Sequence, residues 1–267
     1  MIKTDLDFPT TRKYGKEQVK YVQNRLLEMA LIATNILDKN GFKYCIAYGT
    51  LLGAIRHNGF IPWDDDFDIY LFDDEYDAAV QCLRNNLPSD IVVHDKMNDP
   101  IYWPAWSRLR DLNTECFATL YPDDNAYKYR GINLDLYRIK KVDISEVLLY
   151  RKRENIEFLC RKKSSGLLSE EAFIKMFNQW TKEYNKLLNG NQNKTEYREV
   201  YTFCADNFYF EKDDILPLRK YTFENCTFYG PNNPDNVLKK AFGDYMTIPE
   251  YNKRMPHYDN LVIYKKR

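Results

Sequence analysis

The sequence predicts an α+β fold in which a mixed β-sheet core is flanked by helices and followed by a helical annex. Apolar residues recur at helical spacing near the start of the chain, and several short apolar segments with the length of strands follow them. From residue 143 to about residue 188 the pattern is again mostly helical. The 267 residues are enough for one large domain or for a core with a helical annex.

The predicted elements begin with a helix over residues 16–39, which has a wide apolar face and ends at Gly41. Strands at 43–48 and 67–72 enclose a helical segment at 51–57. The remaining elements are a helix over 73–85, strands at 91–94, 106–112, 115–120 and 132–139, a polar connection at 189–194, a hairpin formed by 220–223 and 227–229, and a helix at 236–242 closed by Gly243.

These elements suggest two parts of one compact unit. We expect residues 1–142 to form the catalytic core with its N-terminal helix, and residues 143–267 to form a helical segment and a C-terminal motif that pack on this core.

Composition and charge exclude several classes of function. Basic and acidic residues balance at 39 each, which argues against a nucleic-acid binder. No stretch approaches the roughly 18 apolar residues of a membrane span, and the first residues lack the apolar segment of a signal peptide. The six cysteines are scattered, as expected of reduced thiols. We therefore expect a cytoplasmic protein that makes at most transient contact with the inner face of the membrane.

Three aspartates carry the strongest chemical signal. Asp66 and Asp68 alternate with apolar residues, so both side chains face the same side of the predicted strand. Two close carboxylates repel each other unless a cation lies between them, and hard oxygen ligands suit Mg²⁺. Asp135, between two leucines on another strand, is costly to bury unless it is paired. An isolated Asp-x-Asp is common on exposed strands, and the run 64–66 is compatible with a solvated loop; the ordered combination favours a metal site.

Gly49 and Thr50 lie where a predicted strand passes into a helix. Backbone amides and the helix dipole favour anions at such a junction, and a glycine allows close approach. We expect this junction to bind a phosphate group.

Longer strings within this region resemble a known family. The chain reads YGTLLGAIRH over 48–57 and GFIPWDDDFDI over 59–69, and it closes with FGDYM over 242–246 followed by Pro249, Arg254 and His257. These strings resemble the LicD family of the polymerase-β-type nucleotidyltransferase superfamily. That family contains bacterial phosphocholine transferases and is related to the fukutin-type phosphotransferases.

The resemblance implies Mg²⁺-dependent transfer of phosphocholine from CDP-choline to a hydroxyl of a glycan or glycolipid precursor, of the teichoic acid or lipopolysaccharide type, with release of CMP. Asp66, Asp68 and Asp135 would hold the metal, Asp135 would accept the proton of the acceptor, and Asp64 would orient a metal-bound water or the acceptor. Three alternatives remain: an alditol phosphate donor, nucleotidyl transfer with release of pyrophosphate, and a non-catalytic module.

Other candidates have weaker support. Arg56, Arg108 and Arg110 have the side chain that clamps phosphate in a bidentate manner, although Arg108 and Arg110 could equally form ion pairs. In the closing motif, Arg254 and His257 are candidates for substrate binding, with a structural hydrogen bond as the alternative for the histidine. Two basic stretches, 151–153 and 161–163, fit either anionic head groups or a solvated helix face with ion pairs; the second is favoured.

Overall fold

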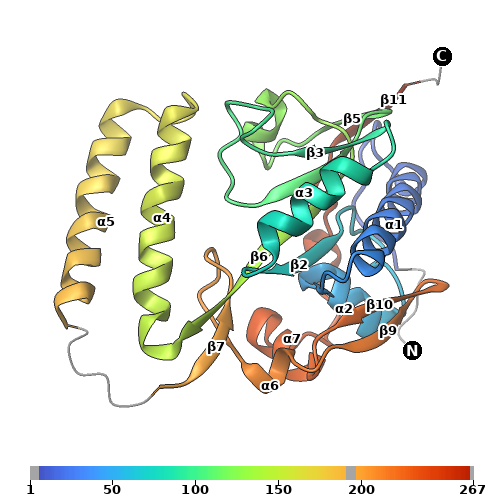
Figure 1. Ribbon diagram of the computed structural model, residues 1–267. Helices are drawn as coiled ribbons and strands as arrows, with labels where there is room; N and C mark the ends of the chain where they lie inside the picture. The colour runs from blue at the N-terminus through green and yellow to red at the C-terminus, as the bar shows by residue number, and fades with distance from the viewer. Residues whose placement is uncertain (1–5, 191–196, 265–267) are drawn as a thin grey trace.

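The computed structural model describes residues 6–190 and 197–264, and its centre is a curled mixed sheet (Figure 1). The order across the sheet is β1-β2-β6-β4-β3. β7 pairs with the last four residues of β6, beyond those that pair with β2, and β8 pairs with β7. β2 and β6 are parallel, whereas the other neighbours are antiparallel. The strands are β1 (Tyr44–Ile46), β2 (Asp68–Phe72), β3 (Ile91–His94), β4 (Ser107–Asp111), β6 (Asn133–Asp143), β7 (Glu199–Thr202) and β8 (Phe210–Glu211). The predicted α+β class is confirmed.

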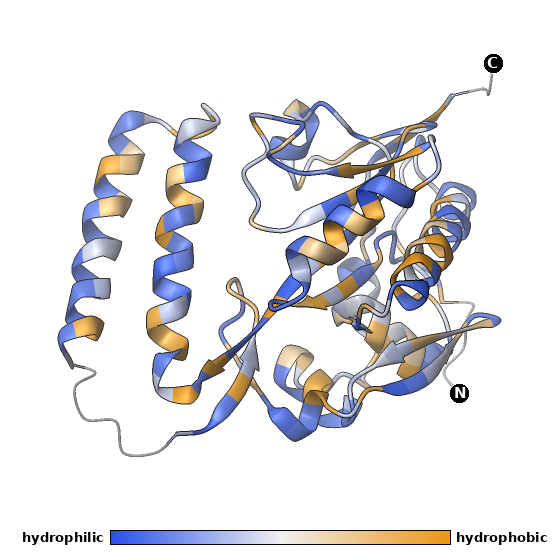
Figure 2. Cartoon of the chain, in the orientation of Figure 1, coloured by the Kyte–Doolittle hydropathy of each residue, from blue (hydrophilic) through white to orange (hydrophobic). Residues whose placement is uncertain are grey.

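The helices contact the sheet, one another and a two-stranded hairpin. α1 (Lys16–Lys39) contacts α3 (Tyr76–Asn86) and β6, and α2 (Tyr48–His57) contacts α7 (Pro234–Phe242) and the β9 strand (Arg219–Phe223). Hydrophobic and hydrophilic residues lie on different sides of α1 and α3 in Figure 2. This arrangement follows from the helical spacing of their apolar residues.

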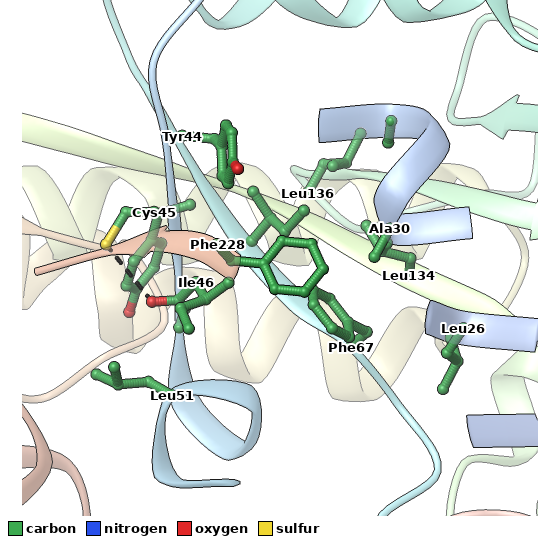
Figure 3. Packing of buried hydrophobic residues seen from close by; sticks show 14 of the residues in the cluster. Leu26, Ala30, Tyr44, Cys45, Ile46, Leu51, Phe67, Leu134, Leu136 and Phe228 are labelled. Carbon is green, nitrogen blue, oxygen red and sulfur yellow. Dashed lines mark hydrogen bonds between the residues drawn. The ribbon is translucent and has the colours of Figure 1, made fainter. Parts of the chain in front are cut away.

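The core between α1 and the sheet explains why the acidic residues face the other way. Leu134 and Leu136 of β6 are fully buried and lie near Phe67 and Phe228 in Figure 3. Phe228 belongs to β10 (Cys226–Gly230), and its ring meets that of Phe67 edge-on at 5.4 Å. Because successive side chains alternate across a strand, burying both leucines turns Asp135 towards the opposite face.

The helical annex is a hairpin of α4 (Val147–Ser164) and α5 (Glu170–Gly190) that stands beside the sheet in Figure 1. The basic residues of its two basic stretches, 151–153 and 161–163, bind to other residues of the protein. Arg151 is buried and donates to Thr202, whereas the others form ion pairs, as the favoured alternative predicts: Lys152 with Glu183, Arg153 with Glu154, Arg161 with Glu157, Lys162 with Asp123 and Lys163 with Glu170. Within the described ranges, none of the helices has both the length and the apolar character needed to cross a bilayer.

Several boundaries differ from the prediction. β6 extends four residues past Ile139, because residues 140–143 pair with β7, which the sequence did not reveal. The region predicted to be helical from Asp143 starts with a 3₁₀ turn, Ile144–Glu146, and α3 starts at Tyr76 rather than Asp73. Further elements were missed, among them β8, α6 (Lys212–Ile215) and β11 (Asn260–Ile263). The polar connection predicted at 189–194 begins within α5 and otherwise lies outside the described residues.

β11 brings the end of the chain back to the core. It pairs with β5 (Thr114–Phe117), so the C-terminal motif is held beside the central sheet. The proposed division at residue 142 remains a prediction, but strands from both sides of it share sheets.

Candidate active site

Three aspartates form a row along one wall of a cavity of about 660 Å³. Asp64, Asp66 and Asp68 all line this cavity, whereas Asp65 and Phe67 between them have no exposed surface. This extended segment therefore alternates, one side chain into the cavity and the next into the protein. The structure confirms that Asp66 and Asp68 share a side and adds Asp64 to the same row.

Asp135 lies directly beside this row. It is the register partner of Asp68 across the parallel pair β2–β6. Its Oδ1 accepts hydrogen bonds from Trp106 Nε1 at 2.5 Å and Arg108 Nε at 2.8 Å, and its Oδ2 accepts one from Asn133 Nδ2 at 2.7 Å. A carboxylate offers about four lone-pair positions. One position therefore remains on Oδ2. Asp135 lines a smaller cavity, which is also lined by Asp66 and His257.

Asp65, which the sequence did not single out, fastens the acidic segment to the C-terminal motif. It accepts hydrogen bonds from Tyr14 Oη at 2.8 Å, from the amides of His257 and Tyr258 at 2.8 and 3.1 Å, and from His257 Nδ1 at 3.0 Å. The run 64–66 is thus no solvated loop. The period of two along this run was the signal that could have identified Asp65 as the inward member.

The row is electrostatically unfavourable without a counter-ion. Burial and the charge of Asp66 raise the pKa of Asp64 and of Asp68 well above the usual value, and burial also raises the pKa of Asp66. Burial disfavours charged His257, but Asp66 and its acidic neighbours outweigh this effect and hold the pKa of His257 well above its usual value. Protons on these groups substitute for a cation.

The donor set fits a hard divalent cation. Asp64, Asp66 and His257 each place one potential ligand atom within 4.8 Å of the others, and Asp68 lines the same cavity. Carboxylate oxygens are the ligands that Mg²⁺ prefers, together with water and substrate phosphate. The Nδ1 of His257 already donates to Asp65, so this nitrogen orients the ring and is not free to ligate.

Comparison with known proteins agrees with this geometry. Residues 41–130, which include Asp64, Asp66 and Asp68, match the model of the LicD/FKTN/FKRP nucleotidyltransferase domain. The chain carries a nucleotidyltransferase domain of the LicD family. Asp135 and His257 lie outside the matched residues, and the fold brings them to the same cavities.

Individual relatives match parts of the chain. It is 48% identical over 62 residues to the lipopolysaccharide cholinephosphotransferase LicD of Haemophilus influenzae, covering 21% of this chain and 23% of that protein. An uncharacterized protein of Rickettsia typhi is 55% identical over 210 residues, covering 79% and 43%. Human ribitol 5-phosphate transferase FKRP is 40% identical over 47 residues, covering 18% and 10%. The chain spans less than half the length of these relatives.

Gly49 and Thr50 help to position two aspartates of the acidic row, Asp64 and Asp68. A Cβ atom on Gly49 would lie 2.7 Å from Asp64 Oδ2, so the glycine makes room for this carboxylate. The hydroxyl of Thr50 accepts a hydrogen bond from the amide of Asp68 at 2.9 Å and fixes the start of β2. Tyr48 and Gly49 line the cavity, which places the N-terminus of α2 at its wall. Their expected contact with phosphate remains a prediction.

The predicted arginines separate into different roles. Arg56 lines the same cavity as the acidic row, and its Nη1 donates to the backbone oxygen of Tyr245 at 2.6 Å. Arg108 and Arg110 both form ion pairs with Asp124, at 2.6 and 3.1 Å. Both arginines therefore form ion pairs, which is the alternative that the sequence left open. Arg110 is almost completely buried, so the expected contact with substrate is not supported.

Arg254, which was expected to bind substrate, makes several contacts within the protein. Its guanidinium lies over the ring of Trp63, and it donates to the backbone oxygens of Pro249 and Asp7 at 2.8 and 2.9 Å. These bonds tie the closing motif to the N-terminal segment of the described chain. These contacts give Arg254 a structural role, and its expected contact with substrate remains a prediction.

An aromatic wall, formed by Tyr48, Trp106, Tyr137 and Phe203, lines the same cavity as the acidic row. Ring centroids along it are 4.9–5.5 Å apart, for Tyr48–Tyr137, Trp106–Tyr137, Trp106–Phe203 and Tyr137–Phe203. The polar atoms of two of these side chains are engaged, since Trp106 Nε1 donates to Asp135 and Tyr48 Oη donates to Asp206. The sequence could not select these rings because they come from four separate segments.

Proposed function

We propose that this chain is a phosphotransferase of the LicD type that uses Mg²⁺ and a nucleotide-activated donor such as CDP-choline. The acceptor is a hydroxyl of a glycan or lipid-linked glycan precursor, of the teichoic acid or lipopolysaccharide type, and CMP is released on the cytoplasmic side. One observation carries the proposal: Asp64, Asp66 and Asp68 face one cavity, with Asp135 in register beside them. A row of carboxylates at a helix N-terminus is suited to an activated diphosphate bound with a cation.

Each side chain has a proposed task. Asp66 and Asp68, with Asp64 beside them, hold the cation, and Arg56 binds a phosphate oxygen of the donor from the adjoining wall. When bound, Mg²⁺ neutralises the charge of the diphosphate and of the leaving phosphate. His257 is kept in place by Asp65 and supplies a further positive charge.

The reaction transfers one phosphoryl group and one proton. The acceptor oxygen forms a bond to the phosphorus that bears the head group, and the bond from that phosphorus to the oxygen of CMP breaks. The hydroxyl proton passes to Oδ2 of Asp135, which has a free lone-pair position. Arg108 and Trp106 hold the other oxygen and fix the orientation of this carboxylate.

The aromatic wall supports choline as the head group. A quaternary ammonium carries positive charge but no hydrogen-bond donor, so it is recognised by ring faces. An alditol phosphate needs hydrogen-bond partners instead, and on this wall Trp106 Nε1 and Tyr48 Oη are already engaged. The alditol alternative is supported by the FKRP relative, whose name is ribitol 5-phosphate transferase.

A donor panel tests the proposal. The purified chain is incubated with Mg²⁺, glycan acceptors and one of three donors, CDP-choline, CDP-ribitol or CTP, and CMP and pyrophosphate are quantified separately. We expect CMP from CDP-choline, with turnover lost in Asp66→Asn. Faster CMP release from CDP-ribitol would favour the alditol alternative, and pyrophosphate released from CTP would indicate nucleotidyl transfer. The absence of turnover with every donor would contradict a phosphotransferase.

A further inference from the structure

Arg56 and His57, the last two residues of α2, form a hydrogen bond with each other inside the protein. Nε of Arg56 donates to Nε2 of His57 at 2.9 Å, and the two residues are only 6% and 5% exposed. They face different spaces, since Arg56 lines the cavity of the acidic row and His57 lines a separate cavity of about 500 Å³. The bond therefore connects a wall of the candidate active site to a residue outside it.

The chemistry of the pair defines the state of the histidine. Arginine has no acceptor, so Nε2 of His57 must accept and the ring proton must lie on Nδ1. Burial and the charge of Arg56 lower the pKa of His57 to about 4, which keeps the ring neutral at pH 7. A neutral ring is required, because a protonated Nε2 could not accept the bond.

Three acceptors on different edges hold the guanidinium of Arg56. Nε donates to His57, and Nη1 donates to the backbone oxygens of Tyr245 at 2.6 Å and Thr247 at 3.5 Å. Since the guanidinium group is planar, these bonds fix its plane and leave other N–H groups free to meet a ligand. The negative charge of Asp64 acts on Arg56, so the oriented guanidinium lies next to the acidic row.

The second ring nitrogen of His57 argues against a purely stabilising role. Nδ1 is buried, and no residue in the described part of the chain accepts its hydrogen bond. A buried donor without a partner costs stability, and such exceptions call for an explanation. An apolar side chain of similar size would avoid this cost but would not accept the bond from Arg56.

We propose that His57 is a positioning residue that orients the guanidinium of Arg56 towards the phosphate of the donor. This inference rests on the proposed phosphotransferase function. In this proposal His57 does not contact the substrate, and it affects turnover only through Arg56.

A double-mutant cycle tests this role. His57→Leu removes the acceptor at similar volume, whereas His57→Gln offers a side-chain oxygen near the position of Nε2. We expect His57→Leu to raise the KM for the donor about tenfold with a smaller change in kcat, and His57→Gln to recover most of the loss. In an Arg56→Ala background, the same substitutions should have no further effect on KM.

The possible outcomes separate the two proposals. Equal losses in His57→Leu and His57→Gln, or effects that add to that of Arg56→Ala, would overturn the positioning role while leaving the phosphotransferase intact. A wild-type chain without turnover would overturn both. Nitrogen NMR of the His57 ring needs neither turnover nor a variant that folds: we expect a proton on Nδ1 and none on Nε2 at pH 7, and the opposite tautomer would refute the inference.

Discussion

Asp65 binds His257 twice, through the backbone amide at 2.8 Å and through ring Nδ1 at 3.0 Å, although 192 positions separate the two residues. The acidic row and the C-terminal motif are therefore joined by a buried carboxylate that does not face the cavity. Its neighbours Asp64 and Asp66 do face the cavity. Adjacent aspartates in one run thus have different roles, and substitution should separate them.

Asp65→Asn should destabilise the protein by about 1–3 kcal/mol, because an amide cannot accept all the hydrogen bonds that this carboxylate accepts. Urea unfolding measures the loss. Asp74→Asn, at an exposed position, is the matched control and should change stability by less than about 0.5 kcal/mol. If Asp65→Asn were as stable as the wild type, its hydrogen bonds to Tyr14, His257 and Tyr258 would not contribute as inferred.

Asp66→Asn and Asp68→Asn should each remove most turnover and leave stability unchanged or increased in metal-free buffer. Burial and neighbouring carboxylates raise the pKa of both carboxyls, so removing one of these negative charges should not lower the free energy of unfolding. A loss of several kcal/mol in transition-state stabilisation corresponds to a rate reduced by more than about a hundredfold. CMP release and thermal unfolding in EDTA measure the two effects. Near-normal turnover in either variant would remove that residue from the site.

Asp135→Asn should lose turnover and also stability, unlike the previous two variants. The substitution removes one of the two carboxylates that pair with Arg108 inside the protein, Asp124 being the other, and we expect this to cost about 1–3 kcal/mol. Comparing unfolding of Asp135→Asn with that of Asp68→Asn checks this, since the two aspartates are register partners. Equal stability of the two variants would show that the bond to Arg108 is not important for the fold.

Gly49→Ala should reduce turnover without unfolding the protein. The added Cβ would lie 2.7 Å from Asp64 Oδ2, and a side-chain oxygen can move away at little cost. Alanine is also the better helix former by about 1 kcal/mol, so stability should not fall. The control is Gly15→Ala, where the nearest atom is Gln18 Oε1 at 3.4 Å. Wild-type turnover in Gly49→Ala would show that the position of Asp64 is unimportant.

Acid should destabilise the fold through His94. Burial and the charge of Arg110 lower its pKa from 6.5 to about 4, so between these values the unfolded chain binds more protons than the folded one. The stability it contributes is complete above pH 6.5 and is lost as the pH falls towards 4. We expect the difference in unfolding free energy between wild type and His94→Gln to change by about 2 kcal/mol from pH 7.5 to pH 4.5. A constant difference would exclude this effect.

The sequence predicted those parts of the site that depend on local pattern. The alternation around Phe67 placed Asp66 and Asp68 on one side, and the leucines around Asp135 indicated its strand. What it could not predict depends on tertiary pairing. Arg110 and Arg254 carry the side chain typical of phosphate sites, yet their partners come from distant segments, which no local pattern reveals. For the same reason β11 was missed, since it is short and stabilised by pairing with β5.

The measurement that most directly tests whether Asp66 and Asp68 hold a cation at the activated phosphate is electron–nuclear double resonance with Mn²⁺ in place of Mg²⁺. The protein is kept in excess over the cation, with CDP-choline bound. Phosphorus hyperfine coupling to protein-bound Mn²⁺ is the predicted result, with loss of that bound species in Asp66→Asn and Asp68→Asn. Mn²⁺ bound to the wild type without phosphorus coupling, or the same coupling in both variants, would contradict this assignment.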